Sequence, residues 1–147
     1  MSIAHRSVTT TWEGPLASGT GSLGEGSSGA LDGQSVTWAA RTERPDHTSP
    51  EELAAAAHSS CFSMALTLTL GEHGTPPQRL DVTATVTLDE VDGRPTITAS
   101  ALRVRATVEG LDTGAFATLV DDAAALCPVS RLYAGAEITV DAHLDQS

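Results

Sequence analysis

Residues 49–74 (SPEELAAAAHSSCFSMALTLTLGEHG) constrain the fold most, because they predict one long apolar helix. Ser49 is a good N-cap, Pro50 suits the first helical position, and Glu52 completes a Ser-x-x-Glu capping box. The apolar residues that follow, from position 53 to position 70, cover almost every side of the cylinder. A helix that is apolar all round is a buried one, so we expect a buried central helix.

The composition limits the class of protein. A chain of 147 residues fits one domain of ordinary size, and we expect a single domain over residues 1–147. The net charge is -11, and all 8 basic residues are arginine, which argues against nucleic acid or an anionic membrane as a partner. The first residues lack the apolar core of a secretory signal, and polar residues interrupt the apolar helix between acidic flanks. We therefore expect a cytoplasmic protein that does not span a membrane.

Strands are predicted on both sides of the helix, which indicates an α+β domain. Before the helix, residues 7–13 alternate as in a strand, residues 18–33 read as a short strand followed by turns, and residues 34–40 read as a further strand of an antiparallel meander. The glycines in this region have no strand-to-helix context that would cradle a phosphate. A polar connection, residues 41–48, leads into the helix.

The second half predicts a hairpin, a helix and a closing strand. Residues 80–91 alternate strictly, Asp92-Gly93 forms a turn, and residues 96–108 form the partner strand. Asp112 or Thr113 then caps a second helix, which Pro128 stops because the residue before a proline avoids helical geometry. Residues 136–144 read as the closing strand.

Two thiols are the candidate reactive groups. Cys61 lies in the middle of the apolar helix, and Cys127 precedes Pro128, which can begin a new short helix and so place Cys127 near its N-cap. A helix N-terminus lowers a thiol pKa, although cysteine is also a common core residue, and spacing alone leaves both readings open. His58 shares a helix face with Cys61 and permits a Cys-His pair, but a hydrogen-bonded core histidine is the simpler interpretation. Two isolated cysteines do not suit zinc.

The motifs around these thiols closely resemble the OsmC/Ohr family of thiol peroxidases, and specifically its OsmC branch. The resemblance rests on SPEEL at 49–53, AAH at 56–58, CFSMAL at 61–66 and CPVS at 127–130, with TWEG at 11–14 near the start. It covers essentially the whole chain. It implies an OsmC/Ohr-like fold, with antiparallel sheets wrapped around the central helix in an intertwined homodimer.

The resemblance also implies an activity, namely reduction of organic hydroperoxides. Cys61 is then the peroxidatic thiol and Cys127 the resolving one, while Arg41 is the active-site arginine and Glu51 the glutamate that holds it. Arg44 is the competing arginine, although its polar surroundings beside Pro45 favour a solvated position. No cofactor or metal is implied, and the reductant is an external dithiol or a lipoylated protein.

One geometric consequence follows from the spacing of Glu51 and Cys61. Ten residues on an unbroken helix separate them by about 15 Å along the axis, so one arginine cannot touch both. We therefore expect shared active sites, in which Arg41 and Glu51 of one subunit meet the thiols of the other.

Two alternatives to the peroxidase remain. One is a non-catalytic, stress-induced redox-sensing or binding protein with the same fold, which does not need an activated thiolate. The other is an exported protein with a structural disulfide, which needs a signal sequence that we do not expect from the first residues.

Overall fold

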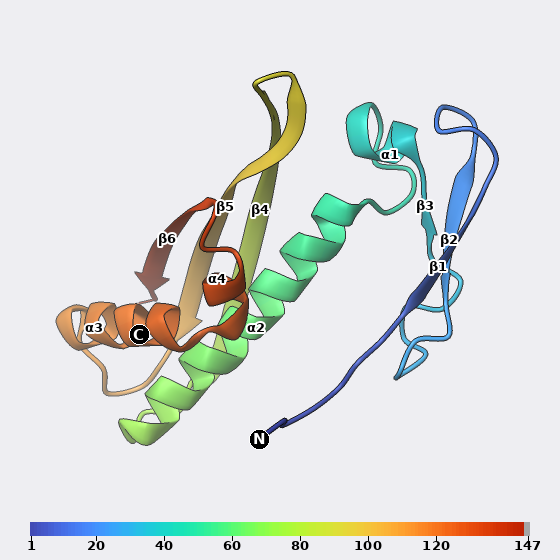
Figure 1. The fold of residues 1–147 in the computed structure, drawn as a ribbon. Coiled ribbons are helices and arrows are strands. Elements are labelled where there is room, and N and C mark those ends of the chain that lie inside the picture. The colour runs from blue at the N-terminus through green and yellow to red at the C-terminus, as the bar shows by residue number, and fades with distance from the viewer. Residues whose placement is uncertain (146–147) are drawn as a thin grey trace. The chain divides into compact units, whose positions relative to one another are not determined.

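The computed structural model describes residues 1–145 (Figure 1). The chain forms two compact units, Met1–Leu53 and Ala54–Ser147, which are considered separately below.

The first unit contains a small antiparallel sheet. Its strands β1 (Thr9–Glu13), β2 (Thr20–Gly24) and β3 (Ser35–Val36) lie side by side in sequence order, which confirms the predicted meander. Glycine is required where the strands crowd together, because a Cβ on Gly21 would lie 2.6 Å from a methyl carbon of Val36.

The predicted strand over residues 34–40 is wrong beyond Val36. The hydroxyl of Thr37 accepts a hydrogen bond from the backbone N–H of Ala40 at 3.0 Å, so Thr37 acts as an N-cap and α1 (Trp38–Thr42) follows. Apolar alternation suggested a strand, and this local capping bond overrides it. As a result Arg41 belongs to the last turn of a helix and not to a loop.

The predicted long helix is present as α2 (Pro50–Glu72). Of the two hydrogen bonds of the predicted capping box, one forms at its start. Ser49 Oγ accepts a hydrogen bond from the N–H of Glu52 at 3.1 Å. The carboxylate of Glu52 accepts from the Thr48 hydroxyl at 2.9 Å, so the return bond of a reciprocal capping box goes to a neighbouring side chain.

Only one face of α2 is buried within a single chain. The buried residues recur at helical spacing and are His58, Phe62, Ala65, Leu66, Thr69 and Leu70. On another face Met64 is 75% exposed and Leu68 is 53% exposed. The expected burial on all sides is therefore not reached in one chain, and large apolar side chains of α2 remain uncovered.

By length and composition, α2 is also the one described helix that could cross a membrane. The core helix of a soluble protein has the same length and composition.

The sheet of the second unit is mixed. Strands β4 (Arg79–Val91) and β5 (Arg94–Thr107) form the predicted antiparallel hairpin, whose turn places Asp92 and Gly93 at positive φ of 51° and 72°. Strand β6 (Glu137–Leu144) pairs with β5 in parallel. The expectation of purely antiparallel sheets is thus wrong for this strand, because the chain passes through two helices between β5 and β6 and returns in the direction of β5.

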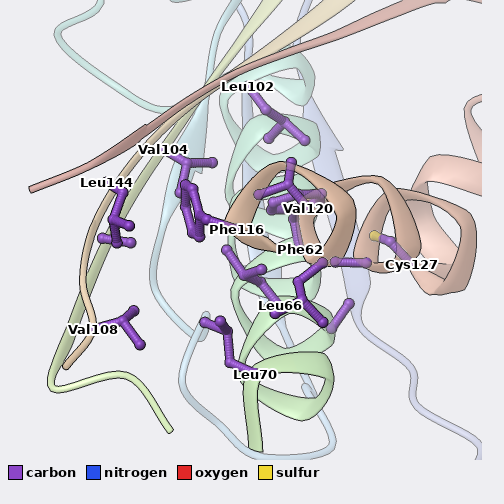
Figure 2. Packing of buried hydrophobic residues seen from close by; sticks show 14 residues of the cluster. Phe62, Leu66, Leu70, Leu102, Val104, Val108, Phe116, Val120, Cys127 and Leu144 are labelled. Carbon is purple, nitrogen blue, oxygen red and sulfur yellow. The ribbon is translucent and has the colours of Figure 1, made fainter. Parts of the chain in front are cut away.

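Those two helices are α3 (Thr113–Leu126) and α4 (Pro128–Leu132). Asp112 caps α3 by accepting from the N–H of Ala115 at 2.9 Å, which decides between the two predicted caps. Side chains from α2, α3 and the sheet meet in one apolar cluster, shown in Figure 2. Cys127 belongs to this cluster, so the core itself holds one of the two thiols in place.

Candidate functional site

The second unit brings the two thiols together although 66 residues separate them in the sequence. Cys61 projects from α2, and Cys127 lies at the junction of α3 and α4. Both cysteines are free, and their Sγ atoms are 3.3 Å apart. A disulfide bond is about 2.05 Å long, so the sulfurs need to approach by only a little more than 1 Å to bond. The geometry suits a dithiol that closes to a disulfide.

Cys127 is the N-cap of α4, as its position before Pro128 predicted. Its side chain is fully buried and its Sγ accepts a hydrogen bond from the N–H of Ser130 at 3.5 Å. Burial raises the pKa of Cys127, but hydrogen bonds from the Ser130 hydroxyl, from the backbone N–H groups of Ser130 and Val129 and from Cys61 outweigh it. The net effect holds the pKa below its ordinary value, so Cys127 is the more acidic thiol of the pair within one chain.

Cys61 has the opposite balance. Burial raises the pKa of Cys61, a backbone hydrogen bond from Val129 lowers it, and the neighbouring sulfur of Cys127 raises it again, so that the pKa lies above its ordinary value. No cation contributes to this balance among the described residues of one chain. Activation of Cys61 as a nucleophile therefore needs a positive charge from elsewhere.

The first unit pairs Arg41 with Glu51, the other two predicted site residues. Nε and Nη2 of Arg41 donate to the same oxygen, Oε1 of Glu51, at 2.9 and 2.7 Å. The guanidinium also lies over the ring of Trp38, 5.7 Å from its centroid. The carboxylate and the ring hold the guanidinium in one orientation, since an ion pair and a cation–π contact act on it together.

The ion pair leaves two polar groups available. Glu51 Oε2 is buried without a hydrogen-bond partner in the described chain, and Nη1 of Arg41 is not used by the glutamate. A buried unsatisfied oxygen is costly, so Oε2 marks a place that a further donor would complete. Arg44, the competing arginine, is 79% exposed and lies 3.9 Å from Asp46, as expected for a solvated side chain.

His58 is a fully buried core histidine and not a partner of Cys61. Its Nδ1 lies 2.6 Å from Ser100 Oγ and its Nε2 lies 2.8 Å from Ser130 Oγ, so both ring nitrogens are occupied. The ring of Tyr133 packs edge-on at 5.3 Å between centroids. The sequence did not point to Ser100 or Ser130. Ser130 is three residues after the cap Cys127, a spacing typical of capping bonds, but Ser100 lies within a strand and gives no signal.

Burial of His58 predicts a specific pH dependence of stability. Burial lowers the pKa of His58 below its ordinary value of 6.5. In the unfolded chain the ring takes up a proton near that value, while the folded chain binds it only at lower pH. Protonation then favours the unfolded state, so the free energy of unfolding should fall as the pH falls below about 6.5.

Denaturant unfolding from about pH 8 to about pH 5 measures this effect. A His58→Gln variant, which cannot titrate, is the control and should lose less stability over the same range. Equal slopes for the two proteins would contradict the prediction.

Residues 1–145 contain no group of three or more His, Cys, Asp or Glu side chains that could hold a metal ion.

Comparison with known proteins shows which family this sequence resembles. The model of the family described as OsmC-like protein matches residues 43–143. Peroxiredoxin OsmC of Escherichia coli (strain K12) is 43% identical over 140 residues, covering 95% of this chain and 96% of the relative. Peroxiredoxin OsmC of Shigella flexneri matches with the same identity and coverage.

Two solved structures of organic hydroperoxide resistance proteins have a fold similar to that of this chain. The organic hydroperoxide resistance protein OhrB of Bacillus subtilis superposes with a TM-score of 0.65 at 26% identity, covering 95% of this chain and 98% of that protein. A second one, named an organic hydroperoxide resistance protein OsmC from Legionella pneumophila, gives a TM-score of 0.70 at 18% identity over 99% of this chain and 100% of that one. These likenesses confirm the expected fold.

Proposed function

Because the chain belongs to the OsmC-like protein family, we propose that it is a thiol peroxidase that reduces organic hydroperoxides to alcohols. The observation that carries this proposal is the separation of the Cys61 and Cys127 sulfurs, 3.3 Å, in the reduced protein. The names of the relatives, Peroxiredoxin OsmC and organic hydroperoxide resistance protein, support the same activity and substrate class.

The cycle begins at Cys61, the more exposed of the two sulfurs. Its thiolate attacks the terminal oxygen of the hydroperoxide and the O–O bond breaks. The alkoxide leaves, takes up a proton and becomes the alcohol, while Cys61 becomes a sulfenic acid. Cys127 then attacks the Cys61 sulfur, the S–O bond breaks, and the hydroxide leaves as water once protonated. An external dithiol returns two electrons and restores both thiols, so the proposed cycle uses no bound cofactor.

Arg41 and Glu51 supply the missing charge in this proposal. A buried thiolate is unfavourable unless a fixed cation lies near it, and arginine stays charged at all relevant pH values. The Glu51 carboxylate orients the guanidinium through Oε1 and leaves Nη1 for a further ligand. That group can donate hydrogen bonds to the thiolate or to the peroxide oxygens as charge develops there.

The active sites are shared between the two subunits of a homodimer. Arg41 is held by Glu51 at the second residue of α2, and Cys61 follows ten residues later on the same helix, about 15 Å along its axis. An arginine held in this way serves the thiol of another subunit. The unsatisfied Oε2 of Glu51 supports the same assembly, because a second chain can bring the donor that one chain lacks.

The exposed face of α2 supports the dimer as well. Met64 and Leu68 line a shallow groove together with Pro77 and Leu80, and polar side chains that include Arg79 complete its wall. Packing α2 of one subunit against α2 of the other would remove these side chains from water, which favours association by the hydrophobic effect. The central helix would then be covered on all sides, as its sequence pattern indicates.

The preferred hydroperoxide, the reductant and the cellular location are inferred from the polarity of the side chains near Cys61 and from the family. Met64 lies three residues after Cys61 on α2 and is 75% exposed, and such an apolar side chain suits alkyl or lipid hydroperoxides better than hydrogen peroxide. The reductant is a dithiol or a lipoylated protein that reaches Cys61, and the protein works in the cytoplasm.

Single-turnover oxidation tests the proposed function. The reduced protein is mixed with cumene hydroperoxide, tert-butyl hydroperoxide or hydrogen peroxide, and free thiols and intact mass are followed with time. We expect one equivalent of organic hydroperoxide to remove two thiols and produce an internal Cys61–Cys127 disulfide, faster than hydrogen peroxide does. Slow oxidation at equal rates with all three oxidants would reject the peroxidase.

A redox-sensing protein without turnover is the second candidate, and the raised pKa of Cys61 within one chain favours it. The two functions differ in the pKa of Cys61 in the assembled protein. A value near the unperturbed thiol value of about 8.5 would favour the sensor, and a value well below it would favour the peroxidase.

A further inference from the structure

A buried hydrogen-bonded chain runs from the sheet to the resolving thiol. It passes from the Ser100 hydroxyl on β5 through both nitrogens of His58 on α2 to the Ser130 hydroxyl on α4, at 2.6 and 2.8 Å. Ser130 in turn donates from its backbone N–H to Cys127 Sγ at 3.5 Å, and its side chain is one of the groups that lower the pKa of Cys127. His58, Ser100 and Cys127 are fully buried and Ser130 is 8% exposed, so water does not substitute for these bonds.

The tautomer of His58 decides what Ser130 can do for the sulfur. A neutral imidazole donates from one nitrogen and accepts at the other, and each serine hydroxyl has one proton to donate. With the proton on Nε2, the ring donates to Ser130 Oγ and accepts at Nδ1 from Ser100. The hydroxyl proton of Ser130 is then free to point at Cys127 Sγ. With the proton on Nδ1, Ser130 has to donate to the ring and offers the sulfur no proton.

We propose that His58 is a positioning residue that fixes the Ser130 hydroxyl as a hydrogen-bond donor to Cys127 Sγ, so that Cys127 reacts as a thiolate when it closes the disulfide. This inference rests on the proposed function for its role in catalysis. A hydrogen bond to a charged acceptor is stronger than one to a neutral acceptor, so the arrangement favours the thiolate over the thiol.

The step balances without a further reactant. Cys127 first releases its proton, and its sulfur electron pair then forms the S–S bond. The S–O bond of the Cys61 sulfenic acid breaks, and the departing hydroxide takes up a proton, so water is the only product released. The Ser130 hydroxyl keeps its own proton throughout and loses only its hydrogen bond when the charge on sulfur disappears.

The same donor serves the reductive half of the cycle. Cys127 is fully buried while Cys61 is partly exposed, so an external thiolate meets the Cys61 sulfur of the disulfide. Cys127 then leaves as a thiolate, and a leaving thiol with a lower pKa leaves faster. Ser130 thus favours the same charged sulfur whether it attacks or departs.

Few other ionisable groups act on this chain of bonds. Cys61 on α2 lies 3.3 Å from Cys127 Sγ, and Tyr133, at the end of α4, packs edge-on against His58. Burial raises the pKa of Tyr133, which therefore stays neutral. No charged side chain of the described residues contributes to the pKa of His58 or of Cys127, so burial and hydrogen bonds together set the pKa of this thiol.

A titration that needs no peroxide tests the inference separately from the proposed function. Cys61→Ser leaves Cys127 as the single thiol, and the ultraviolet absorbance of its thiolate is followed against pH. Adding Ser130→Ala should raise the pKa of Cys127 by about one to two pH units, as expected for loss of a hydrogen bond to a charged group. Ser130→Thr keeps a hydroxyl and should restore the value.

Variants at His58 and Ser100 separate positioning from simple packing. His58→Met removes the ring donor and should raise the pKa of Cys127 as Ser130→Ala does, whereas His58→Gln keeps an N–H donor and should restore part of it. Ser100→Ala is the matched control, because it removes a buried hydroxyl from the same histidine without touching the sulfur. It should lower the thermal midpoint as much as Ser130→Ala but shift the thiol pKa less.

Kinetics with both cysteines present give the second readout. Conversion of the Cys61 sulfenic acid to the disulfide should be at least about tenfold slower in Ser130→Ala near neutral pH. The plot of this rate against pH should move to higher pH. Equal pKa values of Cys127 in the folded Cys61→Ser proteins with and without Ser130→Ala would overturn the inference. Absence of any sulfenic acid in the parent protein would instead reject the proposed peroxidase and leave the titration result standing.

Discussion

Cys61→Ser is expected to lose essentially all hydroperoxide reduction, a decrease of at least about a thousandfold. A serine hydroxyl is almost entirely protonated near neutral pH and is a weak nucleophile unless a base activates it. His58 cannot act as this base, since both of its ring nitrogens are occupied by Ser100 and Ser130. The measurement is consumption of cumene hydroperoxide in a single turnover, with intact mass to detect any oxygen added to the protein.

Cys127→Ser is the matched control for this result. It leaves Cys61 in place, so the first turnover should still consume one equivalent of hydroperoxide. Without a resolving thiol, the Cys61 sulfenic acid should persist and then oxidise further to sulfinic acid when peroxide is in excess. Peroxide reduction that survives in Cys61→Ser and disappears in Cys127→Ser would reverse the two roles. The lower pKa of Cys127 within one chain makes that reversal a real alternative to exclude.

Local signals in the sequence predicted most elements of this fold. The alternation before and after Asp92-Gly93 predicted the β4–β5 hairpin, and Ser49 and Pro50 predicted the start of α2. Cys127 as the cap of α4 followed from the proline after it. Each of these features depends on residues within one turn or one strand pair, which is the range over which sequence patterns act directly.

Three features of the fold were missed, one for a local reason and two because they depend on parts beyond the local sequence. Residues 34–40 carry the alternation of a strand, but the Thr37 cap converts them to α1. The parallel pairing of β6 with β5 is decided by the route through α3 and α4, which no local pattern records. Burial of α2 was predicted on all sides because the pattern does not distinguish burial within a chain from burial between chains.

The candidate site also contains residues that the sequence predicts and residues that it does not. The sequence predicts the four residues Cys61, Cys127, Arg41 and Glu51, and the structure adds their spatial pairing, thiol with thiol and arginine with glutamate. Their catalytic roles stay predictions. Ser100 and Ser130 could not be chosen from the sequence, because a serine in a strand or a short helix is unremarkable until a buried histidine is seen between them.

Arg41→Ala is expected to slow the oxidation of Cys61 by at least about a hundredfold, because a fixed donor aimed at developing charge is worth that much in other enzymes. Glu51→Gln should slow it less, since the guanidinium keeps its charge but loses its ionic partner. Rates of sulfenic acid formation with cumene hydroperoxide measure both effects. A solvated cation, Arg44, provides the control: Arg44→Ala changes the net charge equally and should leave the rate unchanged.

Mixing two inactive variants then tests whether the sites are shared. In a heterodimer of Arg41→Ala with Cys61→Ser, a shared arrangement rebuilds one complete site, from Arg41 of one subunit and Cys61 of the other. Random exchange of equal amounts should recover about a quarter of the wild-type activity, since half the dimers are mixed and each has one intact site of two. If each site lies within one subunit, every mixed dimer contains only damaged sites and no activity returns. Recovery in the mixture, with none in either variant alone, therefore requires Arg41 to act across the dimer interface.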